Sequence, residues 1–295
     1  MRLTRMPGQS GMAKRRAGGW KTWMAVPMCL ALLLAMLPSG HAELLTGGVR
    51  QQVLYDNAHE HALNGRVVSQ QSGQPLSDVL VSLPDLGVSA RTDADGGFIL
   101  PVMPTQPTII SLSRKGYVPH AETLEYHALQ DVDTSLEFRL KTLEQTVVLD
   151  DELRHLGDNT YSKKSAGARR FKLGRDSQPV LQKPFILPGS FREALGSVDR
   201  VVLEVGTIIG LDTREAQRQG QSHFSHSASP MIVRLNGRVI GHIALNGDSH
   251  QIMVDKRLLL PSGINMLEIA TGYHYPDGQR IDYDDIELMV ITLAY

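Results

Sequence analysis

Residues 63–69 read L-N-G-R-V-V-S, residues 74–84 read Q-P-L-S-D-V-L-V-S-L-P, and residues 92–100 read T-D-A-D-G-G-F-I-L. Apolar side chains alternate with polar ones in these short runs, and Gly, Pro, Asp and Asn separate the runs. Such alternation is typical of half-buried strands joined by tight turns. The stretch therefore predicts a small all-β domain. Its strands are expected over residues 65–69, 79–83, 108–113 and 133–140.

The segment T-D-A-D-G-G-F at 92–98 is similar to the start of a calcium loop, but the apolar Phe98-Ile99-Leu100 follows where oxygen ligands are needed. A hairpin turn is therefore the prediction. Together with L-S-R-K-G-Y-V-P at 112–119, these runs resemble the carboxypeptidase regulatory-like domain, a transthyretin-like β-sandwich, over residues 63–140. The resemblance implies an appended module and not a catalyst, and no zinc-protease motif accompanies it.

Residues 1–42 have the features of a secretory signal peptide. Six basic residues and no acidic residue occur in this segment, and an apolar run extends over 24–37. Gly40 and Ala42 supply the small residues that signal peptidase recognises, so cleavage is expected after Ala42. The apolar run is shorter than the roughly 20 residues of a membrane span. The mature chain is therefore expected to be periplasmic or secreted, with no integral span after cleavage.

Loss of this leader removes the single cysteine, Cys29, and both tryptophans. The remaining 253 residues have no disulfide and no thiolate, and they are enough to bury one or two cores. They keep 24 basic and 31 acidic residues, so their formal net charge is −7. This charge argues against nucleic acid as a partner, because such binding depends on neutralising phosphates.

The rest of the chain divides into four predicted parts. These are an N-terminal arm at 43–62, the first sandwich at 63–140, a linker at 141–183 and a second domain at 184–295. Within the linker, residues 147–156 favour one or two helical turns. Residues 159–175 are basic and poor in apolar side chains, which is typical of a solvated linker. Contact of this basic run with an anionic polymer or with lipid head groups is the alternative.

The second domain also reads as many short strands. It includes V-R-L-N-G-R-V-I-G-H at 233–242, with a hairpin turn of type I′ at Asn236-Gly237, and L-L-L-P-S-G-I-N-M-L-E-I-A at 258–270. These runs resemble the galactose-binding-like jelly roll over roughly residues 198–295. The predicted fold class is therefore all-β: two β-sandwich modules, a transthyretin-like sandwich and then a jelly roll, after a cleaved signal peptide.

One polar cluster is the candidate binding site. Its aromatic members, the candidate ligand-binding residues, are Tyr273, His274, Tyr275 and Tyr283. Tyrosine faces stack on sugar rings, so this part of the cluster favours a glycan. The Pro276-Asp277-Gly278 turn is expected to bring the two flanks together.

The carboxylates of the same cluster suggest a metal. Asp282, Asp284 and Asp285 are candidate ligands of a structural Ca²⁺, which takes six to eight oxygens. The galactose-binding-like resemblance implies that Asp285 is the best placed of the three. In an extended segment Asp282 and Asp284 lie on the face opposite to Asp285, so one ion would need a bend. An ordinary polar hairpin is the third interpretation.

No catalytic residue is assigned. Adjacent aspartates on one hairpin do not flank a cleft, which glycoside hydrolysis requires. The sequence has no nucleophile elbow, phosphate-binding loop or dinucleotide fingerprint. The H-x-x-H at 223–226 lacks further ligands for a metal, so an exposed loop is expected there.

The sequence thus predicts an exported, non-catalytic binding or adaptor protein, whose C-terminal jelly roll engages a carbohydrate or an envelope protein. Two alternatives stay open. One is an accessory subunit or enzyme of envelope polysaccharide metabolism, and the other is a structural assembly component that pairs through strand edges. A groove lined by Tyr and Asp would favour glycan binding, whereas a flat apolar patch would favour assembly.

Overall fold

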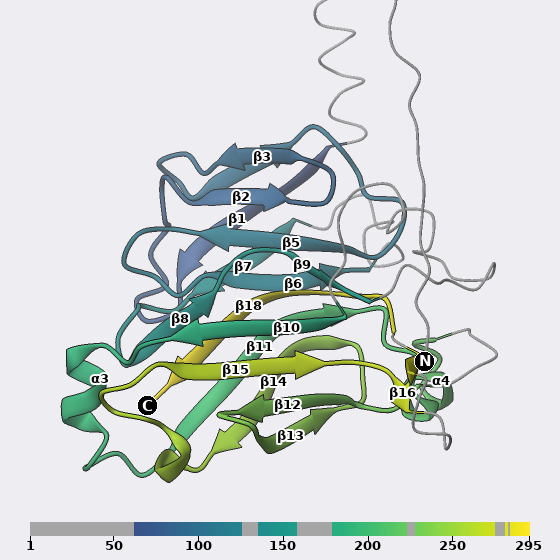
Figure 1. Ribbon diagram of the computed structural model, residues 1–295. Coiled ribbons are helices and arrows are strands. Elements are labelled where there is room, and N and C mark those ends of the chain that lie inside the picture. Colours follow the sequence, from purple (N-terminus) through teal and green to yellow (C-terminus); the bar gives the residue numbers. More distant parts are fainter. Residues whose placement is uncertain (1–61, 126–134, 158–178, 223–227, 275–280, 283) are drawn as a thin grey trace, which may run out of the picture. The chain divides into compact units, whose positions relative to one another are not determined.

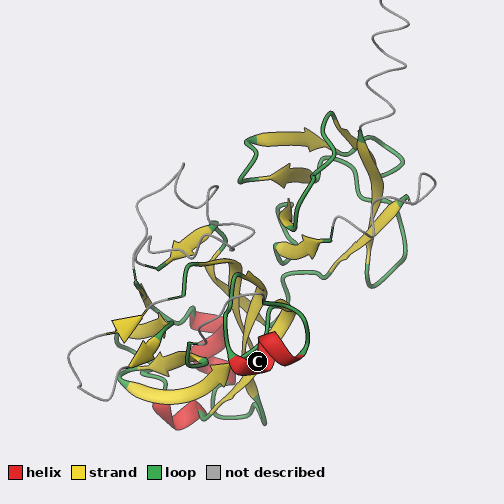
Figure 2. Cartoon of the chain, turned by 90° about the vertical axis from the view of Figure 1, so that its right-hand side faces the viewer, coloured by secondary structure: helices red, strands yellow, loops and turns green. Residues whose placement is uncertain are grey.

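The computed structural model describes residues 62–125, 135–157, 179–222, 228–274, 281–282 and 284–295 (Figure 1). Regular structure in these ranges is almost entirely β-strand, and the helices are short (Figure 2). The all-β prediction is therefore confirmed. The expected signal peptide and nearly all of the N-terminal arm lie outside these ranges. No helix within them is long and apolar enough to cross a membrane.

The N-terminal sandwich contains a three-stranded and a four-stranded sheet (Figure 1). The first has the order β4-β1-β7, in which β1 pairs antiparallel with β4 and parallel with β7. The second has the order β3-β2-β5-β6 and is antiparallel. The strands are β1 (Leu63–Ser69), β2 (Leu80–Leu83), β3 (Val88–Arg91), β4 (Gly97–Leu100), β5 (Thr108–Ser113), β6 (His120–Leu124) and β7 (Leu136–Leu140).

The C-terminal sandwich contains sheets of order β10-β15-β12-β13 and β14-β11-β18-β8, and β9 also pairs with β18. The strands are β8 (Thr146–Asp150), β9 (Arg154–Leu156), β10 (Val180–Phe185), β11 (Val201–Ile209), β12 (Met231–Leu235), β13 (Arg238–Ile243), β14 (Gly247–Val254), β15 (Asn265–Ala270) and β18 (Ile286–Ala294). The helices are α3 (Gly189–Ala194), α4 (Arg214–Arg218) and the 3-10 turn η2 (Lys256–Leu258). A two-stranded hairpin, β16 (Tyr273–His274) and β17 (Ile281–Asp282), lies between β15 and β18 in sequence.

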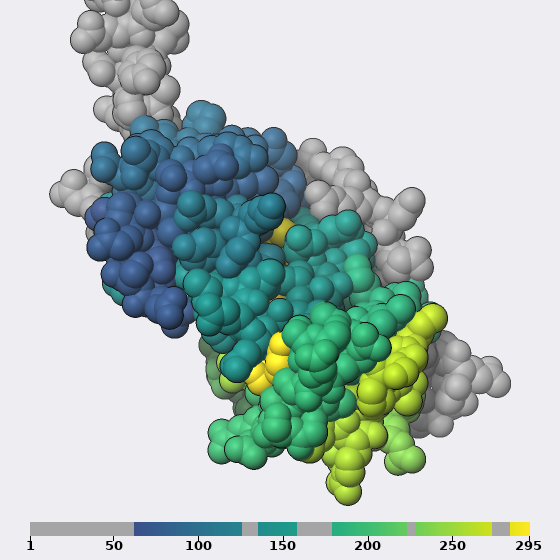
Figure 3. Space-filling view, turned by 90° about the vertical axis from the view of Figure 1, so that its left-hand side faces the viewer, coloured from purple at the N-terminus to yellow at the C-terminus, as the bar shows by residue number. Residues whose placement is uncertain are grey.

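Strand β18 is the most enclosed element of this sandwich. It pairs with β11 on one side and with β8 and β9 on the other. Eight of its nine residues are buried. On the face drawn in Figure 3, only small areas of its yellow atoms appear between the teal and green atoms of other segments. A strand buried on both faces explains the nearly continuous apolar run I-E-L-M-V-I-T-L-A.

The linker prediction over 141–183 is wrong in part. Residues 147–156, expected to favour helical turns, form β8 and β9, and both strands add to the sheet of the C-terminal sandwich. β10 begins at Val180 and belongs to the other sheet of the same sandwich. The C-terminal sandwich therefore starts near Thr146. The basic run 159–175 lies outside the described residues.

Each sandwich has its own apolar core. One core consists of residues of β1 to β7 and their turns, with Phe98 and Phe138 in contact at a centroid distance of 6.0 Å. The other includes Phe191 of α3, which packs on Tyr295 at 4.2 Å. A small third cluster joins them, in which Ile109 and its neighbours on β5 and β6 meet β18. The prediction of two sandwich cores is thus confirmed.

Two turns predicted from the sequence are confirmed. Asn236 and Gly237 have φ of +49° and +79°, as a type I′ hairpin turn requires. In the segment 92–98, the Asp93 carboxylate accepts hydrogen bonds from the backbone N–H of Asp95 (2.9 Å) and Gly97 (2.8 Å). Asp93 therefore closes a turn.

Candidate functional site

The β16–β17 hairpin carries the centre of the predicted cluster. Its register places Tyr273 directly opposite Asp282, and His274 opposite Ile281. The Pro276-Asp277-Gly278 turn, Tyr275 and Tyr283 lie outside the described residues. The expected pairing of the two flanks is confirmed for the backbone of Tyr273, His274 and Asp282.

Asp284 and Asp285 follow the hairpin and are both buried, each with 8 % of its surface exposed. Asp284 Oδ2 accepts a hydrogen bond from the backbone N–H of Asp212 at 3.3 Å. Asp285 Oδ1 lies 3.9 Å from Nε2 of His155, whose side chain is also buried. Asp284 thus contacts the segment after β11, and Asp285 lies near β9.

This arrangement bears on the calcium prediction. Within the part of the chain that the structure describes, no three His, Cys, Asp or Glu side chains are grouped as a metal site. Asp284 and Asp285 are directed to separate partners, and only the backbone of Asp282 is described. A structural Ca²⁺ at Asp282, Asp284 and Asp285 stays a prediction.

Asp212 connects three segments at this end of the sandwich. Its Oδ1 accepts hydrogen bonds from Gln217 Nε2 in α4 and from Ser222 Oγ, both at 2.7 Å. Its backbone carbonyl accepts from the N–H of Ala228 at 2.6 Å. Its own N–H donates to Asp284. Asp212, three positions after the end of β11, thus contacts α4, both flanks of 223–227 and the segment that follows the hairpin.

Asn246, in the turn before β14, forms hydrogen bonds with the segments on either side of α4. Its side-chain oxygen accepts from the N–H of Leu211 at 2.7 Å, and its side-chain nitrogen donates to the Leu211 carbonyl at 3.2 Å. Its own N–H donates to Gln221 Oε1 at 3.1 Å. Thr213 adds a further tie, because its hydroxyl caps α4 at Ala216 and donates to the Ala244 carbonyl. These bonds link the segment after β11, α4 and Gln221 to the turn between β13 and β14.

Sequence reasoning missed Asp212 and Asn246. Asp212 precedes Thr213, which reads as a helix N-cap, and Asn246-Gly247 reads as a hairpin turn. The cap at Thr213 is a local signal and it is present. The contact of Asp212 with Asp284 spans 72 positions, and only the register of β11 with β18 brings the two together.

The exposed loop expected at the H-x-x-H residues is preceded by ordered structure. α4 extends to Arg218, and Ser222 is buried against Asp212. The H-x-x-H residues at 223–226 lie outside the described ranges. The chain on either side of them is fixed, since Ser222 and Ala228 both bond to Asp212.

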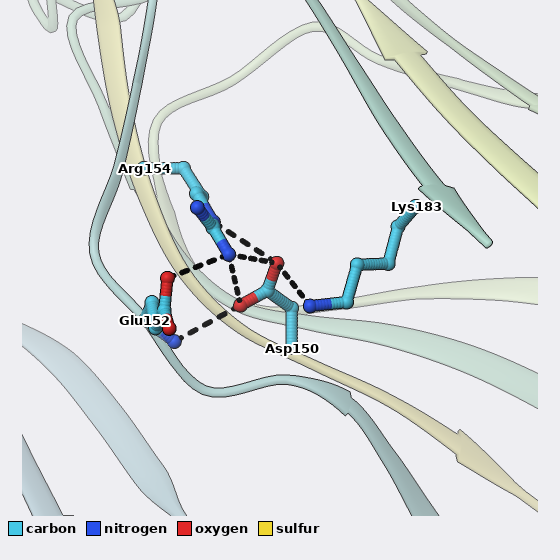
Figure 4. A network of polar contacts seen from close by, with 4 residues as sticks. All are labelled: Asp150, Glu152, Arg154 and Lys183. Carbon is cyan, nitrogen blue, oxygen red and sulfur yellow. Dashed lines mark hydrogen bonds and ion pairs between the residues drawn. The ribbon is translucent and has the colours of Figure 1, made fainter. Parts of the chain in front are cut away.

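A second polar network serves packing. Asp150 of β8 has a side chain only 1 % exposed, and it bonds to Arg154 of β9 at 2.9 Å and to Lys183 of β10 at 3.2 Å (Figure 4). Its carboxylate also accepts from the backbone N–H of Glu152. Because β8 and β10 belong to different sheets, this network ties the two sheets of the sandwich together.

His250 of β14 makes stability depend on pH. Burial lowers the pKa of its imidazole below the usual value, although a hydrogen bond with Gly247 and the charge of Asp248 oppose the shift. Its Nε2 is buried without a hydrogen-bond partner among the described residues. The unfolded chain therefore binds this proton more readily than the folded one, so stability should fall as the pH drops below about 6.5.

We expect the thermal unfolding midpoint to decrease as the pH is lowered from about 7.5 to about 5. The decrease should be smaller in His250→Gln than in the parent chain. Thermal unfolding at several pH values measures this. His242→Gln, an exposed position of β13, is the control and should keep the parent pH dependence. Equal slopes for His250→Gln and the parent would contradict the assignment.

Comparison with known proteins gives one family match and distant structural similarity. No curated protein matches the chain. One similar structure is BpGH86A, a β-porphyranase of glycoside hydrolase family 86 from the human gut bacterium Bacteroides plebeius, at 12 % identity and a TM-score of 0.26. The match covers 80 % of this chain and 32 % of that one, so the chain spans about a third of that enzyme.

A second similar structure is described as a candidate carbohydrate-binding protein from Bacteroides uniformis ATCC 8492. It is 9 % identical, with a TM-score of 0.21, and the match covers 80 % of this chain and 99 % of that one. TM-scores of this size carry no argument about fold or function. The galactose-binding-like resemblance of the C-terminal sandwich therefore stays a prediction.

The family match concerns the N-terminal sandwich. The model of the carboxypeptidase regulatory-like domain matches residues 62–141, which span β1 to β7 and their two sheets. The predicted boundaries, 63–140, differ by one residue at each end. Residues 62–141 of this chain are a carboxypeptidase regulatory-like domain.

Proposed function

We propose that this chain is an exported, non-catalytic binding protein whose C-terminal sandwich engages a carbohydrate at the β16–β17 end. The observation that carries the proposal is the register of the hairpin, which sets Tyr273 opposite Asp282. An aromatic ring stacks on the apolar face of a sugar, and a carboxylate accepts hydrogen bonds from its hydroxyls. Directly paired residues share one face of a hairpin, and we propose that one ligand contacts both groups.

The surroundings of the hairpin support this proposal. Asp284 lies two positions after β17 and accepts a hydrogen bond from the backbone of Asp212, whose carboxylate is bonded to Gln217 of α4 and to Ser222. A binding site gains affinity when its supporting residues are fixed before the ligand arrives. The carboxypeptidase regulatory-like domain would serve as a spacer or docking module for this sandwich.

The carboxylates support binding and not hydrolysis. Asp284 and Asp285 are neighbours in sequence, are both buried, and interact with Asp212 and His155. Glycoside hydrolysis uses two carboxyl groups that face each other across a cleft at about 5–9 Å. Two adjacent residues of one segment do not flank a cleft, so we assign no hydrolytic role to Asp284 and Asp285.

A glycan array probed with the mature protein, in calcium and in chelator, tests the proposal. We expect a defined set of glycans to bind, and Tyr273→Ala and Tyr275→Ala to weaken that binding by about tenfold or more, which corresponds to about 1.4 kcal/mol. Tyr117→Ala in the N-terminal domain is the matched aromatic control and should bind like the parent chain.

Comparing the protein in calcium with the protein in chelator separates two roles of the Tyr/Asp cluster. If Asp282, Asp284 and Asp285 hold Ca²⁺, chelator lowers the melting temperature, because a ligand at a hundredfold excess over Kd adds about 2.7 kcal/mol to folded-state stability. If the cluster only contacts glycan, chelator leaves the melting temperature unchanged. An array without hits would contradict glycan binding.

A second candidate function is assembly with a protein partner, and one observation favours it. Ile186 and Ile264 are each 63 % exposed, and Met266 lies directly opposite Pro184 on the β10–β15 pair. Continuing that register by one pair sets Ile186 opposite Ile264. An exposed apolar row of this kind is typical of protein contacts. An empty array together with concentration-dependent sedimentation would favour this function.

A further inference from the structure

Asp212 connects several segments near the hairpin, and its contacts divide into two kinds. The carboxylate serves α4 and Ser222, whereas the backbone N–H and carbonyl serve Asp284 and Ala228. The side chain therefore fixes one set of neighbours and the backbone the other. Substitution of the Asp212 side chain therefore releases the first set and leaves the backbone groups of the second set in place.

A carboxylate at this position has an energetic cost that packing alone does not require. Asp212 is 7 % exposed, and Asp284, which is 8 % exposed, accepts from its N–H. Burial of charged groups is unfavourable unless strong hydrogen bonds compensate for it. The two bonds of 2.7 Å to Asp212 Oδ1 have the length of charge-assisted hydrogen bonds. We therefore attribute the two buried acids, Asp212 and Asp284, to a need to fix the positions of their neighbours and not to stability alone.

We infer that Asp212 is the positioning residue of the proposed carbohydrate-binding end, through which α4, Ser222 and Asp284 keep one arrangement beside the β16–β17 hairpin. This inference rests on the proposed function. Asp212 does not touch the sugar, because its carboxylate is buried and occupied by Gln217 and Ser222. It acts by limiting the positions that the neighbouring segments adopt, which lowers the ordering cost of binding.

The test compares Asp212→Ala with Asp212→Asn. Alanine removes the acceptor of both Gln217 and Ser222. Asparagine keeps an oxygen at the Oδ1 position, where both bonds are received. We expect the glycan Kd to rise about tenfold or more in Asp212→Ala and by no more than about threefold in Asp212→Asn. Asp150→Ala is the control, since it removes a buried carboxylate from a network away from the hairpin.

Hydrogen exchange supplies a readout that needs no ligand. The N–H groups of Gly220 and Gln221 bond to the carbonyls of Gln217 and Ala216 at 3.1 and 2.8 Å, so they are protected while α4 is held. In Asp212→Ala these two amides should exchange about tenfold faster or more. The amide of Ala228 bonds to the backbone carbonyl of Asp212 and should keep its protection.

The outcomes separate this inference from the proposed function. Faster exchange at Gly220 and Gln221 with weaker glycan binding in Asp212→Ala, and near-parent behaviour in Asp212→Asn, supports it. Unchanged exchange in Asp212→Ala overturns it, even if the parent chain binds glycan. Equal loss of glycan binding in Asp212→Ala and Asp150→Ala also overturns it, because general destabilisation would then explain the effect. If the parent chain binds no glycan, the proposed function fails, and with it the role of Asp212 in binding, whatever the exchange rates show.

Discussion

Substitution of Gly210 by alanine should lower the free energy of unfolding of the C-terminal sandwich by about 2–5 kcal/mol. Gly210 follows β11 with φ of +98°, where a residue with a Cβ is strained by about 1–2 kcal/mol. A Cβ at this position would lie 2.5 Å from the carbonyl oxygen of Asp285 and 3.1 Å from Cα of Ile286. Both are backbone atoms, so the start of β18 must move, and overpacking adds about 1–3 kcal/mol.

Gly237→Ala is the matched control for this prediction. Gly237 has φ of +79°, but no atom lies within 4 Å of the position that its Cβ would take. Only the conformational cost of about 1–2 kcal/mol should appear there. Urea unfolding followed by circular dichroism measures both variants. A loss at Gly210 no greater than that at Gly237 would show that the close approach to Asp285 does not occur.

Asp150→Ala has the second large expected effect, a loss of about 1–3 kcal/mol. Removing one partner of a buried ion pair costs about 3–5 kcal/mol. Arg154 and Lys183 each keep 31 % of their side-chain surface exposed, so both regain some hydration and the expected loss is smaller. The change should appear as a lower urea midpoint of the C-terminal sandwich.

Glu137→Ala provides the comparison for Asp150. Glu137 pairs with Arg139 at 2.6 Å, but these side chains are 46 % and 60 % exposed. A solvent-exposed pair contributes about 0–1 kcal/mol, so little change is expected. If both variants lose the same small amount, the Asp150 network does not tie the two sheets together.

Local signals in the sequence were enough for most strands and turns. Asn236-Gly237 and the Asp93 turn are both present, because their residues alone select the conformation. Residues 147–156 were expected to favour helix, since a short apolar run does not distinguish helix from strand. They form strands because both pair with one edge of β18, which lies 130 or more positions away in sequence.

The candidate site was predictable only where pairing is local. The Pro276-Asp277-Gly278 turn indicated that Tyr273 and Asp282 pair across a hairpin, and their backbones do. Asp212 was not found, because its contact with Asp284 depends on the register of two distant strands. The local sequence around a polar residue after a strand does not indicate which distant segment that residue will contact.

Amide chemical-shift mapping during titration with an array-selected glycan tests most directly whether a carbohydrate binds at the β16–β17 end. We expect the amide shifts of Tyr273, Asp282, Asp284 and the residues around Asp212 to change, and those of residues 62–141 to stay the same. Changes confined to the exposed row at Ile186, or to the carboxypeptidase regulatory-like domain, would contradict it.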